Sequence, residues 1–456
     1  MRLLWFTCLF CSAVWAQEFP RLSEGARSIQ LTGGTVPIPV GLCTMVRVPV
    51  LEGDITPEHN LVRICEKPYL HTIGLGVTWE DMQPTPASPT GDVLRRCVRN
   101  LEQAEKLAGR ETPLPIILKF YFYKVPEWTM AEQPPGLVTP VLATNKLGMT
   151  VLSCPPRRTA AGNEVRAEDL PLSTDPGYHA QLEKLMAEVD RTLAEIDPDG
   201  KRFVAIHYVG PAMNSNQMRV PYYDLFPNIG NSPLGCDWTK QKHIQAWINM
   251  AHAMGKFDSF KKRAWIFNFT NLGSAKVPGA MTLNTAEQAS VYHAIQQIHP
   301  DGSGAVIAKT ESLCVNFNQR LKNLREASVY ELNYDENDTG CWRRQMLEMD
   351  QVIPYKFIAS QKACHAWENW AGFSPGRDLR STSLYPLDEL IKNSLYLDPQ
   401  SETPQQPQGT LWVEVWPQEA INPDGFRRFD DSDERLFDSL VRWDNLLRST
   451  LIEAMK

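Results

Sequence analysis

The stretch "FVAIHYVG", residues 203–210, is an almost continuous apolar run, and the polar sequence "PAMNSNQMRVP", residues 211–221, follows it directly. Unbroken apolar and β-branched residues are typical of a strand buried on both faces, as in parallel sheets covered by helices. Loops that follow such strands often carry binding residues. The stretch therefore predicts a parallel strand whose carboxyl end, from His207 to Gln217, opens into a functional loop.

Seven further stretches have the same character and alternate with helix-like segments. The strand-like stretches are residues 43–50, 71–79, 115–123, 264–270, 305–310, 328–334 and 410–416. The helix-like segments are residues 93–109, 178–196, 239–257, 285–298, 317–327 and 433–455. Eight strands interleaved with helices predict an α/β protein, a (β/α)₈ TIM barrel. The alternative is an open doubly wound sheet, but no Gly-rich phosphate-binding sequence follows an early strand.

Two longer segments interrupt this alternation. Residues 130–170 follow the third strand and contain a hairpin pattern, "TPVLAT" and then "MTVLSC". Residues 372–409 precede the eighth strand and end in the polar sequence "DPQSETPQQPQG". We expect both to be loop insertions in a single barrel domain, residues 17–456, that includes a short N-terminal extension. In a barrel, a long segment after a strand lies at the carboxyl face, where the active site is found.

The first residues, "MRLLWFTCLFCSAVWAQ", combine one Arg, an apolar run and small residues near Ala16. This pattern is typical of a signal peptide, residues 1–16, and predicts a secreted or periplasmic protein. An N-terminal membrane anchor is the alternative, although the run is short for a span. No later stretch approaches the roughly 20 apolar residues of a spanning helix.

Charge and cysteine content exclude several classes of function. The formal net charge of −7 becomes −8 without residues 1–16, and there is no basic run, which argues against nucleic-acid binding. The eight cysteines that remain permit disulfides, and we expect some, but none is spaced as in a zinc site. His243 and His252 do not have metal-pair spacing, and we expect neither a metal nor a cofactor.

Aromatic, amide and carboxylate side chains recur where the predicted strands end. Aromatic rings stack on the C–H faces of sugars, while amides and carboxylates hydrogen-bond to hydroxyls. The sequence therefore predicts a carbohydrate substrate or ligand. The candidate sugar-binding residues are Trp79, Glu80, Glu127, Trp128, His207, Asn216, Asn268, Tyr334 and Trp416. A His on an apolar strand, such as His207, is more often a core or contact residue than a base.

Three short motifs resemble the clan of (β/α)₈ glycoside hydrolases that includes bacterial β-galactosidases. Trp79 precedes Gln83-Pro84 after the second strand, the third strand leads into Pro126-Glu127-Trp128, and Asn216-Gln217 follows the fourth. In that clan the second strand leads to Glu-Pro and the fourth to Asn-Glu. The resemblance implies an acid/base residue at position 217 and a nucleophilic Glu at the end of the seventh strand.

The chain departs from the clan pattern at both positions, since Gln83 and Gln217 replace Glu. A carboxamide does not supply a proton near neutral pH, so Gln217 cannot act as the general acid. Four explanations stay open. The first is that the alignment of the fourth strand is shifted, and the second is that another carboxylate, such as Glu127 or Glu311, is the acid. The third is that the sequence carries an introduced Glu→Gln change, and the fourth is that the site only binds sugar.

The nucleophile is equally open. Glu331 lies in the predicted seventh strand, Asp335 and Glu336 lie just after it, and Glu311 directly follows the predicted sixth strand. Glu414 lies inside the apolar stretch "LWVEVW", where alternation places it on the face of Trp412 and Trp416. We expect a secreted glycoside hydrolase acting on a poly- or oligosaccharide. The alternatives are a barrel that binds carbohydrate without cleaving it, or a partner-binding protein without an aromatic-lined cleft.

Overall fold

The computed structural model describes residues 26–31, 34–51, 53–122, 125–158, 164–208, 240–268, 285–311, 356–359 and 410–415. Within these ranges eight parallel strands form a closed barrel. In spatial order they are β3 (Gly41–Arg47), β4 (Leu70–Thr78), β5 (Ile116–Tyr121), β11 (Phe203–Tyr208), β12 (Ala264–Asn268), β13 (Val306–Glu311), β14 (Lys356–Ala359) and β15 (Thr410–Val415). The predicted α/β barrel is confirmed.

The seventh place in the barrel belongs to β14, which pairs with β13 on one side and β15 on the other. The sequence predicted this strand at residues 328–334, and that prediction was wrong. The reason is length, because "KFIA" is too short to show a strand pattern, whereas "SVYELNY" is longer and rich in aromatic and β-branched residues. Residues 328–334, with Glu331 and Tyr334, lie outside the described residues and outside the seventh barrel strand.

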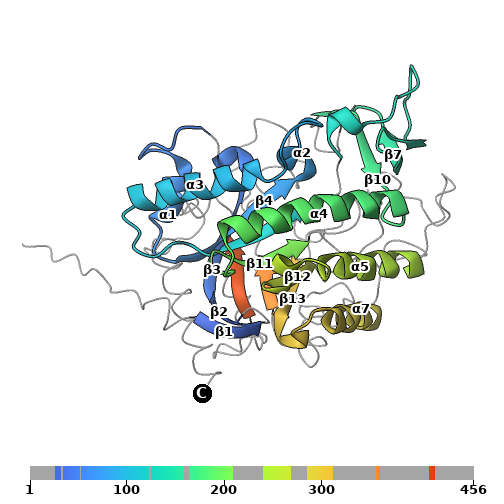
Figure 1. Ribbon diagram of the computed structural model, residues 1–456. Coiled ribbons are helices and arrows are strands. Elements are labelled where there is room, and N and C mark those ends of the chain that lie inside the picture. The colour runs from blue at the N-terminus through green and yellow to red at the C-terminus, as the bar shows by residue number, and fades with distance from the viewer. Residues whose placement is uncertain are drawn as a thin grey trace, which may run out of the picture.

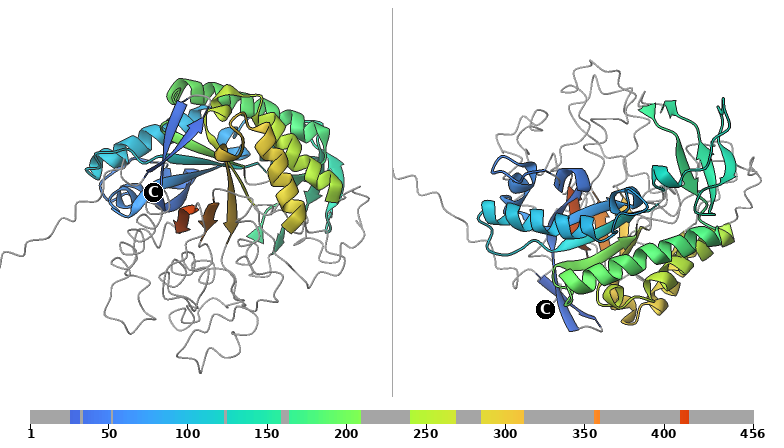
Figure 2. Two further views of the ribbon diagram at one scale, coloured as in Figure 1. Left: turned by 90° about the horizontal axis from the view of Figure 1, so that it is seen from below. Right: turned by 45° about the horizontal axis from the view of Figure 1, so that its top comes forward.

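Four long helices lie on the outside of the barrel (Figures 1 and 2). They are α3 (Asp92–Leu107), α4 (Pro176–Ile196), α5 (Lys240–Met254) and α7 (Thr285–Ile298). The start of α4 is fixed locally: Asp175 accepts a hydrogen bond from the Tyr178 backbone N–H at 2.8 Å, and Pro176 supplies a preset φ angle. Shorter helices are α1 (Asn60–Cys65), α2 (Trp79–Met82), α6 (Asp258–Lys261), η2 (Val48–Leu51), η3 (Glu127–Thr129) and η4 (Gly302–Ala305).

Smaller antiparallel sheets lie outside the barrel. Between β5 and α4, strands β6 (Val141–Thr144), β7 (Thr150–Cys154) and β10 (Glu168–Pro171) form a three-stranded sheet, and β8 (Arg157–Arg158) pairs with β9 (Glu164–Val165). A hairpin of β1 (Ala26–Leu31) and β2 (Gly34–Pro39) precedes the barrel. Figure 1 shows the three-stranded sheet and this hairpin at opposite ends of the molecule.

The barrel strands alternate between two hydrophobic clusters. One cluster fills the interior and includes Ile117, Ala205, Ile266, Ile307 and Trp412, one from each of five strands. The other lies between the strands and the helices and includes the neighbouring residues Leu118, Ile206, Phe267, Ala308 and Val413. This period of two is the pattern of a strand buried on both faces. It identifies which side chains point into the barrel.

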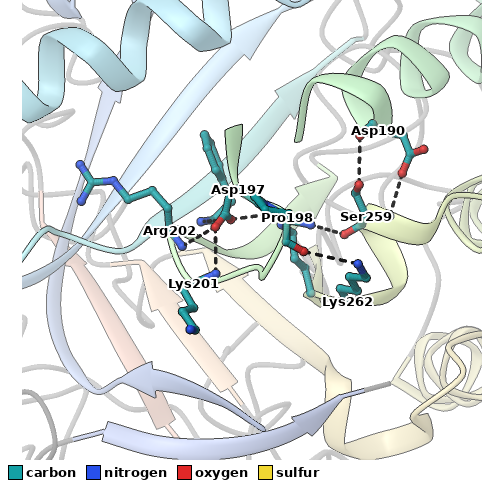
Figure 3. A network of polar contacts seen from close by, with 9 residues as sticks. Asp190, Asp197, Pro198, Lys201, Arg202, Ser259 and Lys262 are labelled. Carbon is teal, nitrogen blue, oxygen red and sulfur yellow. Dashed lines mark hydrogen bonds and ion pairs between the residues drawn. The ribbon is translucent and has the colours of Figure 1, made fainter. Parts of the chain in front are cut away.

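A network of hydrogen bonds around Asp197 connects the segments that precede β11 and β12 (Figure 3). The Asp197 carboxylate accepts hydrogen bonds from three backbone N–H groups, those of Lys201, Arg202 and Phe203, at 2.8 to 3.0 Å. The buried Arg263 guanidinium also donates to it, at 2.8 Å. Because Phe203 begins β11 and Arg263 directly precedes β12, one carboxylate fixes the entry of two barrel strands.

Candidate functional site

A layer of polar side chains lies inside the barrel, next to the hydrophobic interior cluster. It consists of Lys119, His207, Asn268, Lys309 and Glu414. Each follows a residue of the interior cluster by two positions on its strand, so alternation points it into the barrel one step nearer the strand's carboxyl end. Each is at most 2% exposed. We call these five residues the polar layer.

Glu414 lies at the centre of the interactions in this layer. Its carboxylate forms an ion pair and a hydrogen bond with Lys119 of β5 and a second ion pair, at 3.4 Å, with Lys309 of β13. Neither β5 nor β13 is adjacent to β15 in the barrel. Only a side chain that points inward can reach both, so Glu414 occupies the interior face that alternation predicts.

Burial lowers the pKa of Lys119, the lysine next to this carboxylate. This effect brings the pKa of Lys119 to about 8, while the nearby Glu414 carboxylate opposes the shift and the Lys309 ammonium adds to it. Taking an ammonium group out of water costs free energy, which the ion pair only partly offsets. Lys119 therefore remains mostly protonated at neutral pH and keeps Glu414 paired.

His207 and Asn268 form a second pair in the polar layer. His207 Nε2 lies 2.6 Å from Asn268 Oδ1, and because an amide oxygen only accepts, the imidazole nitrogen donates. Burial holds the pKa of His207 well below its usual value, and the Lys309 and Lys119 ammonium groups lower it further. The imidazole is thus neutral and held in place, which suits hydrogen bonding rather than proton transfer at neutral pH.

Cys43 of β3 lies beside this charged group. Burial raises the pKa of its thiol well above the usual value, and the Glu414 carboxylate raises it further. Nucleophilic cysteines react as thiolates, so these surroundings keep Cys43 unreactive. Neither Cys43 nor Cys65 forms a disulfide, and both thiols are buried.

Trp79 and Trp128 converge on Gln83. The Trp79 indole N–H donates to the Gln83 side-chain oxygen at 3.3 Å, and the Trp128 indole N–H donates to the Gln83 backbone oxygen at 2.9 Å. Trp79 is only 2% exposed and packs in the hydrophobic cluster between strands and helices. Its ring is therefore covered, whereas Trp128 is half-buried and keeps an open surface.

The remaining candidates fall into three groups. Glu80 in α2 is exposed, and Glu127 in η3 is exposed and lies 3.8 Å from Arg166. Glu311 is the last residue of β13, two positions beyond Lys309. The candidates outside the described residues are Asn216, Gln217, Glu331, Tyr334 and Trp416.

Sequence reasoning did not select Lys119, although a signal for it exists. The stretch "IILKFY" places Lys119 inside an apolar strand, just as "LWVEVW" places Glu414. A charged side chain inside a strand buried on both faces needs a partner. A Lys in one such strand and a Glu in another are therefore expected to form an ion pair. Lys309, also in a buried strand, pairs with Glu414 for the same reason.

The described part of the chain contains neither a metal-binding cluster nor a membrane-spanning helix. Among the described residues, no group of three or more His, Cys, Asp or Glu side chains could hold a metal ion. No described helix is both long and apolar enough to cross a membrane.

Neither a protein-family model nor a curated protein sequence matches the chain. Similar solved structures include PbGH5A, a glycoside hydrolase family 5 enzyme from Prevotella bryantii B14, with 11% identity, a TM-score of 0.42 and coverage of 90% of this chain and 96% of that one. Morphinone reductase has 10% identity, a TM-score of 0.40 and coverage of 90% and 94%. The old yellow enzyme from Trypanosoma cruzi has 11% identity, a TM-score of 0.40 and coverage of 74% and 82%. At these levels none of them assigns a function.

Proposed function

We propose that this protein is a glycoside hydrolase-like barrel that binds a poly- or oligosaccharide at the carboxyl end of its strands. The observation that carries the proposal is the polar layer, because the interior of such a barrel is ordinarily filled with bulky apolar side chains. Here it contains a buried carboxylate, two ammonium groups, an imidazole and an amide close to the face where barrel enzymes act. Donors and acceptors of these kinds match sugar hydroxyls.

The ion pairs limit what Glu414 could do in catalysis. A retaining hydrolase needs two carboxyl groups about 5–5.5 Å apart, one as nucleophile and one as acid. Glu414 forms ion pairs with Lys119 and Lys309, and a carboxylate engaged by two ammonium groups does not suit the role of proton donor. The acid would then come from Glu311, at the end of β13, or from Glu127.

A non-catalytic sugar-binding barrel is the second candidate function. Two features favour it: Glu414 is engaged by two lysines, and Gln217 stands where the resemblance implies the acid/base residue. Both functions predict sugar binding, and they differ in cleavage.

The test begins with calorimetric titration of a panel of oligosaccharides against the full chain. Any sugar that binds is then offered to the Gln217→Glu variant, which restores a proton donor of the same length. If position 217 is the acid position, cleavage of natural glycosides should rise about 10²–10⁴-fold. Aryl glycosides should respond less, because their leaving groups need little protonation.

Gln245→Glu is the matched control, because Gln245 is exposed on α5, on the outside of the barrel, and its substitution adds the same charge. Binding without cleavage by either form supports the non-catalytic function. Cleavage by the unmodified chain at ordinary enzyme rates shows that Gln217 is not the acid position. Failure of every sugar to bind contradicts the carbohydrate proposal itself.

A further inference from the structure

An exposed arginine lies at the carboxyl end of the first barrel strand. Arg47 is the last residue of β3, and its guanidinium carbon lies 4.1 Å from the centre of the Tyr121 ring, at the end of β5. Tyr121 itself is largely buried, while Arg47 is exposed. The pair therefore joins a fixed aromatic ring to a cation that solvent can reach.

The intervening strand is shaped to allow this contact. A Cβ atom at Gly76 of β4 would lie 2.9 Å from Tyr121 Cε2 and 3.2 Å from Arg47 Cδ, closer than such atoms normally approach. The Tyr121 hydroxyl also donates a hydrogen bond to Met45 Sδ, at 2.9 Å, which fixes the ring. The absence of a side chain at Gly76 thus lets Arg47 cross β4 and lie on the ring.

The stacked arrangement leaves the N–H edge of the Arg47 guanidinium exposed to solvent. Stacking occupies one face of the group, while its five N–H donors point outward in its plane. In the described part of the chain, no carboxylate forms an ion pair with Arg47. A planar carboxylate can accept two parallel hydrogen bonds from such an edge. The ring contact also restricts the side chain beforehand, which reduces the entropy lost on binding.

The position of Tyr121 relates this pair to the polar layer. Tyr121 follows Lys119 by two positions on β5, so it lies one step farther toward the carboxyl end on the same interior face. Arg47 thus stands at the rim above the polar layer. The formal net charge of −7 gives the chain no general attraction for anions, so an acidic ligand would need a local cation such as this one.

We propose that Arg47, held on Tyr121, binds the carboxylate of a uronic acid residue in the saccharide. This inference rests on the proposed carbohydrate function and names its substrate class as acidic oligosaccharides. A guanidinium with two parallel N–H donors recognises a planar carboxylate better than a neutral sugar hydroxymethyl group.

The experiment compares acidic oligosaccharides with their own methyl esters by calorimetry on the full chain. The probes are oligomers of galacturonic, glucuronic and mannuronic acid, each with a neutral esterified counterpart of equal length. At least one acid form should bind about 10- to 100-fold more tightly than its ester, the range of a charge-assisted hydrogen-bonded pair. Arg47→Gln should remove this difference, and Arg47→Lys should restore part of it.

Arg191→Gln is the matched control, because Arg191 is an exposed arginine on α4, on the outside of the barrel, and its loss changes the net charge equally. Thermal unfolding of each variant reports whether the fold is intact. A second variant, Gly76→Ala, should displace Arg47 from the ring and weaken binding of the acid form only.

The outcomes separate the two proposals. If neutral and acidic sugars bind equally, or Arg47→Gln keeps the preference for acids, the role of Arg47 is overturned while the carbohydrate function stands. If a sulfated oligosaccharide binds more tightly than every uronate, the assignment of a carboxylate is overturned. If no sugar of either kind binds, the carbohydrate function itself fails.

Discussion

Asp197 and Glu414 are both buried carboxylates that accept from a buried cation, but their other partners differ. Asp197 also accepts from three backbone N–H groups of the loop that leads into β11. Glu414 instead accepts from lysine ammonium groups of β5 and β13. Backbone donors belong to the fold itself, whereas side-chain donors can be exchanged without changing the path of the chain. The comparison therefore separates a carboxylate that holds strand entries in place from one that belongs to a candidate site.

Removing the Asp197 carboxylate should have the largest effect on stability. Asp197→Ala would leave Arg263 buried without its carboxylate partner and would remove the acceptor of three backbone N–H groups. We expect the free energy of unfolding to fall by about 4 kcal/mol, measured by urea denaturation. The folded fraction should bind sugar as the unmodified chain does.

The control for this prediction is Asp199→Ala, since Asp199 lies two residues away and is exposed. It should change the free energy of unfolding by less than about 0.5 kcal/mol. A loss of sugar binding in folded Asp197→Ala would show that the network serves more than the fold.

Glu414→Gln should destabilise the protein by about 3 kcal/mol, because it removes a carboxylate that pairs with two buried ammonium groups. A triple variant, Glu414→Leu with Lys119→Met and Lys309→Met, should regain most of this loss, since apolar residues of similar volume often replace a buried ion-paired group well. Urea denaturation measures both effects, and calorimetry measures sugar binding.

The triple variant sharpens the comparison because it separates stability from function. If the polar layer belongs to the sugar site, the triple variant should be stable and should bind no sugar. Sugar binding at the original affinity would instead show that the polar layer is structural, as the network around Asp197 is.

The sequence predicted the barrel because its strands are buried on both faces and its helices are long and amphipathic. It predicted the inward direction of Glu414 because alternation is a local property of a strand. It could not place β14, since four residues carry too little pattern, and it could not foresee that Trp79 lies under other side chains. The pairing of Lys119 with Glu414 depends on barrel closure, which brings together residues 295 positions apart in the chain.

Acidification should produce a smaller loss of stability through buried histidines. Burial lowers the pKa of His243 from 6.5 to about 4, and it also lowers that of His207 in the polar layer. Between pH 7 and 5 the unfolded chain gains protons at these positions while the folded chain does not, so stability falls as pH falls. For His243 the loss at pH 5 is about 2 kcal/mol.

Urea denaturation between pH 7 and 5 measures how steeply the free energy of unfolding falls with pH. His243→Gln should flatten it, whereas His252→Gln, an exposed position on the same helix, should leave it unchanged. An equal slope in all three proteins would mean that the folded chain takes up the proton at His243 as readily as the unfolded one.

The smallest effect should come from Glu183 and Lys256, which form the same kind of Lys–Glu ion pair as Lys119 and Glu414 but on the surface. Their side chains are 33% and 59% exposed, so water and salt screen the attraction. Glu183→Gln should change the free energy of unfolding by less than about 0.5 kcal/mol. Because Glu414 also pairs with Lys309, the difference between the two Glu→Gln effects measures what burial and the second lysine add together in the polar layer. A surface effect as large as that of Glu414→Gln would show that burial is not the source of the difference.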